Sequence, residues 1–130
     1  MAREVFVDAS AWVAVASRRD QHHTVAENIY RRIIAEQRTL ITTNLVVAEA
    51  YNGIRRYTTV TECARFLASL RGSSQIIKMY SDEALEFEAE QWLRRYADHN
   101  FSLVVAVSFA IMRQRRIMEA FTFDNYFAVA

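Results

Sequence analysis

Three acidic residues lie within or directly after apolar stretches of this 130-residue chain, where folding alone would not place a charge. Asp8 follows the letters VFV, Glu49 follows LVVA and Asp124 follows AFTF. A carboxylate among apolar neighbours is costly to bury unless it is paired or holds a metal ion. Three of them along one chain therefore predict a single acidic metal pocket.

The types of ligand predict both the metal and its chemistry. Asp and Glu oxygens without an accompanying Cys or His pattern suit Mg²⁺ or Mn²⁺. Such ions polarise a phosphoryl oxygen and lower the pKa of water, which is the chemistry of phosphodiester hydrolysis. Ser10 and Asn44 are candidates for neutral ligands, or for side chains that hold the carboxylates in place.

Composition excludes several other kinds of site. Two glycines and no proline exclude a Gly-rich phosphate loop of either common kind. The single cysteine, Cys63, excludes an internal disulfide and a cysteine zinc site, and we expect it to be a reduced thiol in the core. The net charge of +1 gives no strong overall attraction to nucleic acid. Because no signal peptide or bilayer-spanning segment is recognisable, we expect a cytoplasmic protein without a membrane partner.

Short apolar runs alternate with segments of helical periodicity, which favours an α/β fold with a parallel sheet. Ser10, Asn44, Ser81 and Ser102 are the expected helix N-caps, and Gly72 is an expected helix stop. The expected strands are at residues 4–8, 39–42, 75–80 and 117–121, and the expected helices at about 10–15, 24–36, 44–56, 61–71, 81–95 and 102–114.

The expected strands explain why the acids should meet. In parallel sheets, ligands bind beyond the carboxyl ends of the strands. Asp8 and Asp124 follow the first and the fourth expected strand, and Glu49 lies on the helix after the second. We therefore expect the functional site at this edge of the sheet.

Four segments resemble, in order and spacing, the motifs of the PIN-domain family. They are VFVDASAW at 5–12, TTNLVVAE at 42–49, FSLVVAVSF at 101–109 and AFTFD at 120–124. One such motif would be weak, whereas four in order cover nearly the whole chain. The chain most resembles the VapC-type ribonuclease toxins of type II toxin–antitoxin modules.

This resemblance implies a single PIN domain over residues 1–130, an α/β/α sandwich with a central, mainly parallel sheet of four or five strands. It also implies an endoribonuclease that needs Mg²⁺ or Mn²⁺, cleaves RNA, forms a homodimer and is bound by a cognate antitoxin. Asp8, Glu49 and Asp124 match the metal-binding, catalytic acids of the family.

The resemblance fails at one acidic position, because Val105 stands where the family has an Asp. If Ser102 is an N-cap, Val105 is the third helical residue, a position that favours an acid through capping and the helix dipole. We expect that a metal ligand has been lost there and that activity is reduced, whether by selection or by natural divergence. Asp98 is a weak substitute, since it precedes the helix.

Other interpretations remain beside this one. The main alternative is a non-catalytic PIN module that binds antitoxin or RNA. An aspartate-nucleophile phosphatase is disfavoured, since Ser10 occupies the place of its second Asp. Arg55 and Arg56 are weak candidates for RNA contacts, because a solvated helix end explains them equally well. The histidines at 22, 23 and 99 are read as solvated or loop residues.

Overall fold

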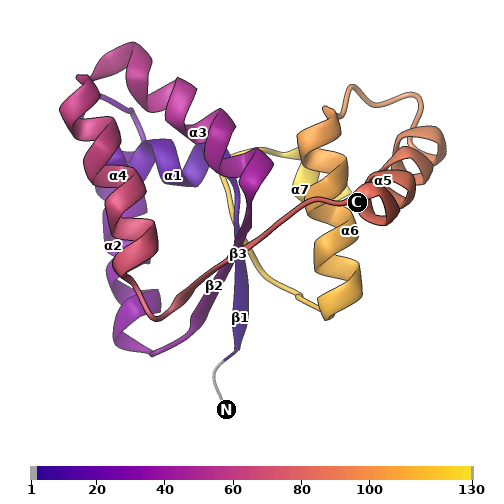
Figure 1. Cartoon of the computed structure of the whole chain (residues 1–130), viewed down its shortest axis with the longest axis horizontal. Coiled ribbons are helices and arrows are strands. Elements are labelled where there is room, and N and C mark those ends of the chain that lie inside the picture. Colours follow the sequence, from indigo (N-terminus) through magenta and orange to yellow (C-terminus); the bar gives the residue numbers. More distant parts are fainter. Residues whose placement is uncertain (1–2, 130) are drawn as a thin grey trace.

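A four-stranded parallel sheet stands between two layers of helices in the computed structural model, which describes residues 3–129, with side chains to residue 127 (Figure 1). The strands are β1 (Glu4–Val7), β2 (Thr39–Thr43), β3 (Ile76–Met79) and β4 (Ala120–Phe121). One layer holds α1 (Ala9–Ala16), α2 (His23–Ala35), α3 (Asn44–Tyr57) and α4 (Val60–Gly72); the other holds α5 (Glu83–Arg95), α6 (Leu103–Arg115) and α7 (Tyr126–Val129). The predicted α/β/α sandwich is confirmed.

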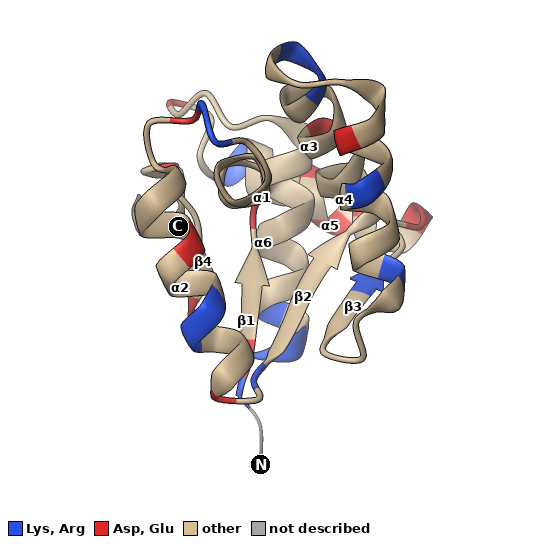
Figure 2. Cartoon of the chain, turned by 90° about the vertical axis from the view of Figure 1, so that its left-hand side faces the viewer, with Lys and Arg blue, Asp and Glu red and all other residues tan. Residues whose placement is uncertain are grey.

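The order of the strands is β3-β2-β1-β4, and all neighbouring pairs are parallel. The central strand β1 is covered on both faces, which explains its continuous apolar sequence. Phe6 pairs with Ile41 on β2 and with Ala120 on β4. Charged residues lie mainly on the helices, and β2 carries none (Figure 2). The chain runs from β1 to β2 and β3 on one side and returns to β4 on the other, so β1 and β4 flank the point where the strand order reverses.

Three predicted helix caps are wrong by one or two residues. The observed N-caps are Asp8 for α1, Thr43 for α3 and Asp82 for α5, in place of the predicted Ser10, Asn44 and Ser81. In each case the residue with extended backbone supplies the acceptor oxygen, and several neighbours are of capping type, so the sequence alone does not choose between them. The predicted cap of α6, Ser102, is confirmed: its hydroxyl accepts from the N–H of Val105 at 3.1 Å.

Strand β4 is shorter than predicted because α6 ends in a left-handed residue. Arg116 has φ 55° and ψ 43°, and the N–H of Ile117 donates back to the carbonyl of Met112 at 2.9 Å. This closure holds Ile117 at the helix end, as in a Schellman motif. The predicted strand at 117–121 therefore contributes only Ala120 and Phe121 to the sheet.

The core fills both sides of the sheet. Cys63 is fully buried on α4, as predicted, and Gly72 is the last residue of that helix. A separate aromatic cluster, formed by Phe101, Val105 and Phe109, packs between α6, α5 and the last residues described. Within the described part of the chain, no helix has the length and apolar character that crossing a bilayer requires.

Candidate metal and active site

Asp8 occupies the carboxyl end of the central strand and is buried, with 3% of its surface exposed. Its Oδ2 atom accepts hydrogen bonds from Ser10 Oγ at 2.9 Å and from Thr122 Oγ1 at 3.0 Å. Its backbone N–H donates to the carbonyl of Phe121 at 3.1 Å. The carboxylate is therefore fixed by hydroxyl groups from the start of α1 and from the segment after β4.

Asp124 is brought beside Asp8 because β4 pairs with β1. Its N–H donates to Thr122 Oγ1 at 2.9 Å, and its Oδ1 accepts from the N–H of Tyr126 at 2.9 Å. The first bond ties Asp124 to the hydroxyl that contacts Asp8, and the second caps the turn into α7. Both acids are thus positioned by the same short stretch of chain.

Glu49 reaches the site from α3. The residues 49, 52, 53 and 56 recur at helical spacing and present one face of α3 to the two aspartates. Helix α1 packs closely against this face: a Cβ built at Gly53 would lie 2.7 Å from Val13 Cγ2. Glycine there allows the two helices to approach, which sets how far Glu49 stands from the strand ends.

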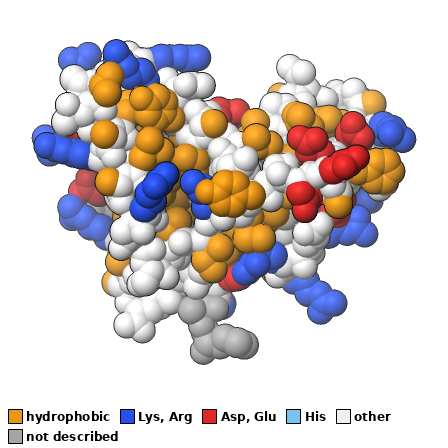
Figure 3. Space-filling model, in the orientation of Figure 1, with side chains coloured by type: hydrophobic (Ala, Val, Ile, Leu, Met, Phe, Trp, Pro, Cys, Tyr) orange, Lys and Arg blue, Asp and Glu red, His pale blue; other side chains and the backbone are white. Residues whose placement is uncertain are grey.

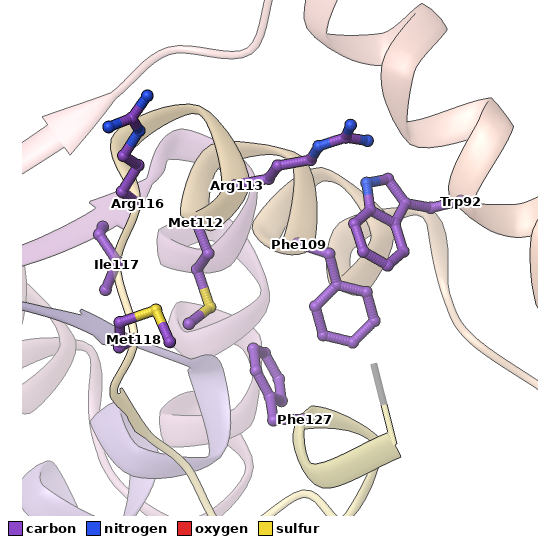
Figure 4. Close-up of a pocket in the computed structure, with 8 residues that line it drawn as sticks. All are labelled: Trp92, Phe109, Met112, Arg113, Arg116, Ile117, Met118 and Phe127. Atoms are coloured by element: carbon purple, nitrogen blue, oxygen red, sulfur yellow. The ribbon is translucent and has the colours of Figure 1, made fainter.

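These three acids line one cavity of about 580 Å³, which we call the acid cavity. Its lining residues are Asp8, Ala9, Ser10, Val13, Asp20, His22, Glu49, Asn52, Gly53, Arg56, Tyr57, Phe123 and Asp124. A second cavity of about 540 Å³, the apolar cavity, lies among α5, α6 and α7, with the rings of Trp92, Phe109 and Phe127 on one side and Met112, Ile117 and Met118 on the other (Figure 4). Of these two, the acid cavity combines strand ends with carboxylates, as expected for a ligand site.

The acid cavity gathers negative charge, with Arg56 as a basic residue on its wall. The pKa of Glu49 lies above its ordinary value, first because of partial burial and then because of the charges of Asp8 and Asp124. None of the ion pairs within residues 3–129 includes any of the three acids. Carboxylate oxygens with unbalanced charge fit a hard divalent cation.

The side chains of Asp8, Glu49 and Asp124 do not form a complete set of metal ligands in this structure. Among the described residues, no three His, Cys, Asp or Glu side chains are close enough together to hold a metal ion. Mutual repulsion of the carboxylates favours such separation, and Oδ2 of Asp8 is engaged by hydroxyls. Glu49 is exposed and lies on the face of α3 that lines the cavity with the two aspartates.

Val105 is held away from the acid cavity. It is 5% exposed and packs with Phe101 and Phe109, and the described lining of the acid cavity does not include it. Its position as the third residue of α6 agrees with the prediction. Valine thus fills an apolar contact at the place where the resemblance to the family predicts an acid.

The structure places the weaker candidate residues in different surroundings. Asp98 lies in the turn before α6 with its side chain 86% exposed, 3.9 Å from His99, and does not line the cavity. Asn44 does not line the described acid cavity: its Oδ1 accepts from the N–H of Ser81 at 2.9 Å and ties α3 to the segment before α5. Ser10, by contrast, contacts Asp8 directly.

The two arginines at the end of α3 also differ. Arg56 lines the acid cavity, seven residues after Glu49 on the same helical face. Arg55 points elsewhere and donates to the carbonyl of Thr58 at 3.1 Å. The helical spacing from Glu49 would have favoured Arg56 over Arg55.

Sequence reasoning missed four residues that build the site: Asp20, His22, Thr122 and Phe123. Thr122 lies two residues before Asp124, a spacing that allows the hydroxyl to bond the following N–H groups. His22 and Phe123 stack in parallel at the cavity, with ring centroids 4.3 Å apart. His22 was read as a solvated helix start, since nothing in its local sequence indicates a partner far along the chain.

The fold and site place the chain in a known class: residues 5–130 match the PIN domain, so the chain belongs to the PIN-domain family. It is similar to the 23S rRNA-specific endonuclease VapC20 from two strains of Mycobacterium tuberculosis, at 30% identity over 126 residues, which covers 97% of this chain and 93% of each relative. A crystal structure of Mycobacterium tuberculosis VapC20, titled a sarcin–ricin loop cleaving toxin, superposes with a TM-score of 0.86 at 28% identity, over 96% of this chain and 93% of that one. The resemblance to PIN-domain, VapC-type proteins is thus confirmed.

Proposed function

We propose that this chain is an endoribonuclease of the VapC toxin type that requires Mg²⁺ or Mn²⁺ and is impaired by Val105. The observation that carries the proposal is the convergence of Asp8, Glu49 and Asp124 on one cavity, with no basic side chain paired to them in the described part of the chain. RNA cleavage is supported by the relatives, whose names state endonuclease activity on 23S rRNA.

Each acid has a separate role in this proposal. Asp8 and Asp124 hold a divalent cation at the ends of β1 and β4, and Glu49 completes the set from α3. A bound Mg²⁺ or Mn²⁺ would supply Lewis acidity at the phosphorus and neutralise phosphate charge. Ser10 and Thr122 orient Asp8 through their hydroxyls, as outer partners of metal ligands commonly do. Arg56, on the same wall, is placed to contact a phosphate of the RNA.

The proposed impairment follows from the apolar residue at position 105, which packs in the aromatic cluster. With valine at 105, the site has three carboxylates in place of the family's four, and less negative charge for a second cation. The test compares this chain with Val105→Asp and with Val105→Asn, which adds a polar group of similar size but no charge. Cleavage of a sarcin–ricin loop RNA hairpin is followed with Mg²⁺ and with EDTA. We expect EDTA-sensitive cleavage to rise at least tenfold in Val105→Asp alone. Equal rates in all three proteins would contradict the impairment.

A non-catalytic PIN module is the second candidate, and the burial of Val105 in an apolar cluster favours it. In that case the chain binds antitoxin or RNA without cutting. It differs from the first candidate in one result: Val105→Asp would bind RNA and remain unable to cleave it at any Mg²⁺ or Mn²⁺ concentration. If the protein neither cleaves RNA nor binds metal, it is a non-catalytic PIN module.

We also propose a location, a protein partner and an oligomeric state for this chain. A toxin of this type acts in the cytoplasm, pairs with a cognate antitoxin and forms a homodimer. Light scattering after size-exclusion chromatography measures the mass of the free protein directly, and a mass of one chain, 15.1 kDa, would exclude the dimer at that concentration.

A further inference from the structure

One wall of the acid cavity carries two aromatic rings that the carboxylates do not need. His22 and Phe123 both line the cavity, and their rings stack with centroids 4.3 Å apart and planes within 5° of parallel. Both residues stay partly exposed despite this contact. Unpaired nucleobases stack on flat aromatic surfaces of this kind in RNA-binding proteins.

The imidazole of His22 is presented to the cavity without being used to tie elements together. The N–H of His22 donates to Asp20 Oδ1 at 2.8 Å, which fixes the turn before α2. The next residue is different: His23 Nδ1 lies 2.8 Å from the carbonyl of Ala14, and its Nε2 lies 3.1 Å from Glu27. Within the described residues, the ring nitrogens of His22 have no hydrogen-bond partner, so hydrogen bonding accounts for the ring of His23 and leaves the nitrogens of His22 available to a ligand.

Phe123 is tied to the acids through one hydroxyl. Its N–H donates to Ser10 Oγ at 3.0 Å, and the same Oγ contacts Asp8 at 2.9 Å. Asp124 follows it directly in the chain. The aromatic pair and the carboxylates therefore keep a fixed spacing, so a base resting on the pair would hold its own phosphate group near the acids.

The approach to this wall is also electrostatically restricted. Acidic side chains gather over α5 at the right of Figure 3, and Glu83, Glu86, Glu88 and Glu90 come from that helix. Such a face repels a polyanion. The acid cavity has Arg56 on its wall, beside Tyr57, which is 53% exposed. Arg56 therefore offers a phosphate contact in the same cavity that the aromatic pair lines.

We propose that the His22–Phe123 pair binds a nucleobase of the RNA next to the phosphate held at the acids. This inference rests on the proposed ribonuclease function and names its substrate contact. Since every base has a flat face, stacking positions the strand and does not read its sequence.

The experiment uses an RNA hairpin that carries the fluorescent base 2-aminopurine at successive loop positions, with EDTA present so that binding is measured without cleavage. Stacking quenches the fluorescence of that base. We expect His22→Ala to weaken binding about tenfold and to abolish quenching at one position, and Phe123→Leu to do the same. His22→Tyr, which keeps a ring, should retain most of both.

The chain offers a matched control. His99 also stacks on a phenylalanine, Phe101, with centroids 5.4 Å apart, but neither residue lines the acid cavity. His99→Ala should bind and quench like the unchanged chain. On an RNA that lacks the quenched base, His22→Ala and the unchanged chain should bind equally well. A variant that had failed to fold would still bind this RNA more weakly than the unchanged chain.

The outcomes separate the pair from the proposed function. If the unchanged chain binds RNA and His22→Ala and Phe123→Leu bind and quench equally well, the aromatic pair is not the contact and ribonuclease function stands. If neither the unchanged chain nor Val105→Asp binds RNA, both proposals fail. Position-specific quenching that disappears in both variants and persists in His22→Tyr supports the pair.

Discussion

The acid cavity and the apolar cavity have nearly equal volumes, about 580 and 540 Å³, and opposite chemistry. In the apolar cavity, aromatic and thioether side chains satisfy one another by packing, so the free energy of folding is enough to explain them. The acid cavity is lined by four carboxylates, those of Asp8, Asp20, Glu49 and Asp124, and none of them is in an ion pair within the described residues. The acid cavity, which packing alone would disfavour, is therefore the one proposed to hold a ligand.

Position 105 connects the two regions. The resemblance to the family predicts an acid at this position, whereas the packing of Val105 places it in the aromatic cluster. Phe109 of that cluster and Phe127, which packs against it, also line the apolar cavity. The residue at position 105 thus determines whether the start of α6 carries a negative charge or makes an apolar contact. The following predictions test this division, from the largest expected effect to the smallest.

Asp8→Asn should weaken Mn²⁺ binding by about 100-fold, since losing a ligand costs at least as much as losing its outer partner. Isothermal titration calorimetry measures the affinity. Asp98→Asn is the matched control, an exposed acid outside the acid cavity, and its affinity should equal that of the unchanged chain. Equal losses in both variants would show that general negative charge, not this cavity, attracts the ion.

Val105→Asp should lower the free energy of unfolding by about 1–3 kcal/mol, because a polar group then replaces a buried contact with two phenylalanines. Urea unfolding followed by fluorescence measures it. Val105→Asn should lose a similar amount. Added Mn²⁺ should restore stability in Val105→Asp only. If Mn²⁺ rescues neither, position 105 belongs to packing alone.

Glu49 should make stability depend on pH. Its pKa in the folded chain lies above the ordinary value of 4.5, so the folded state binds the proton more tightly than the unfolded state. Its contribution is fully present below the unfolded pKa and is lost as pH rises through the folded pKa. Relative to the unchanged chain, Glu49→Gln should therefore gain stability as pH rises above about 4.5. Thermal unfolding at several pH values, with EDTA, measures the difference, and a constant difference would contradict the coupling.

Arg56→Ala should weaken RNA binding a few-fold and reduce the slope of affinity against salt by about one, as expected for one phosphate contact. Filter binding at several salt concentrations measures both. Arg55→Ala is the neighbouring control, since Arg55 is bonded to Thr58 and lies off the cavity wall. A larger effect for Arg55 would mean that RNA crosses the other side of α3.

Much of the fold and part of the site follow from local patterns. The apolar runs and helical periodicity place every strand, and the acids stand out because their neighbours are apolar. Three of the four predicted N-caps and the length of β4 were wrong, because they depend on which of several capping residues takes the extended backbone and on the left-handed turn at Arg116. The stack of His22 on Phe123 could not be predicted, since it forms only when distant segments meet at the same strand ends.

The hydroxyl of Ser10 has a consequence for how the protein is synthesised. It links Asp8, made early, to Phe123, made late, so the two halves of the site meet only after β4 has paired with β1. A ribosome still translating this chain therefore carries no assembled site, whatever helices have already formed. For a protein proposed to cleave RNA, this order of assembly delays activity until the ribosome has made the last motif.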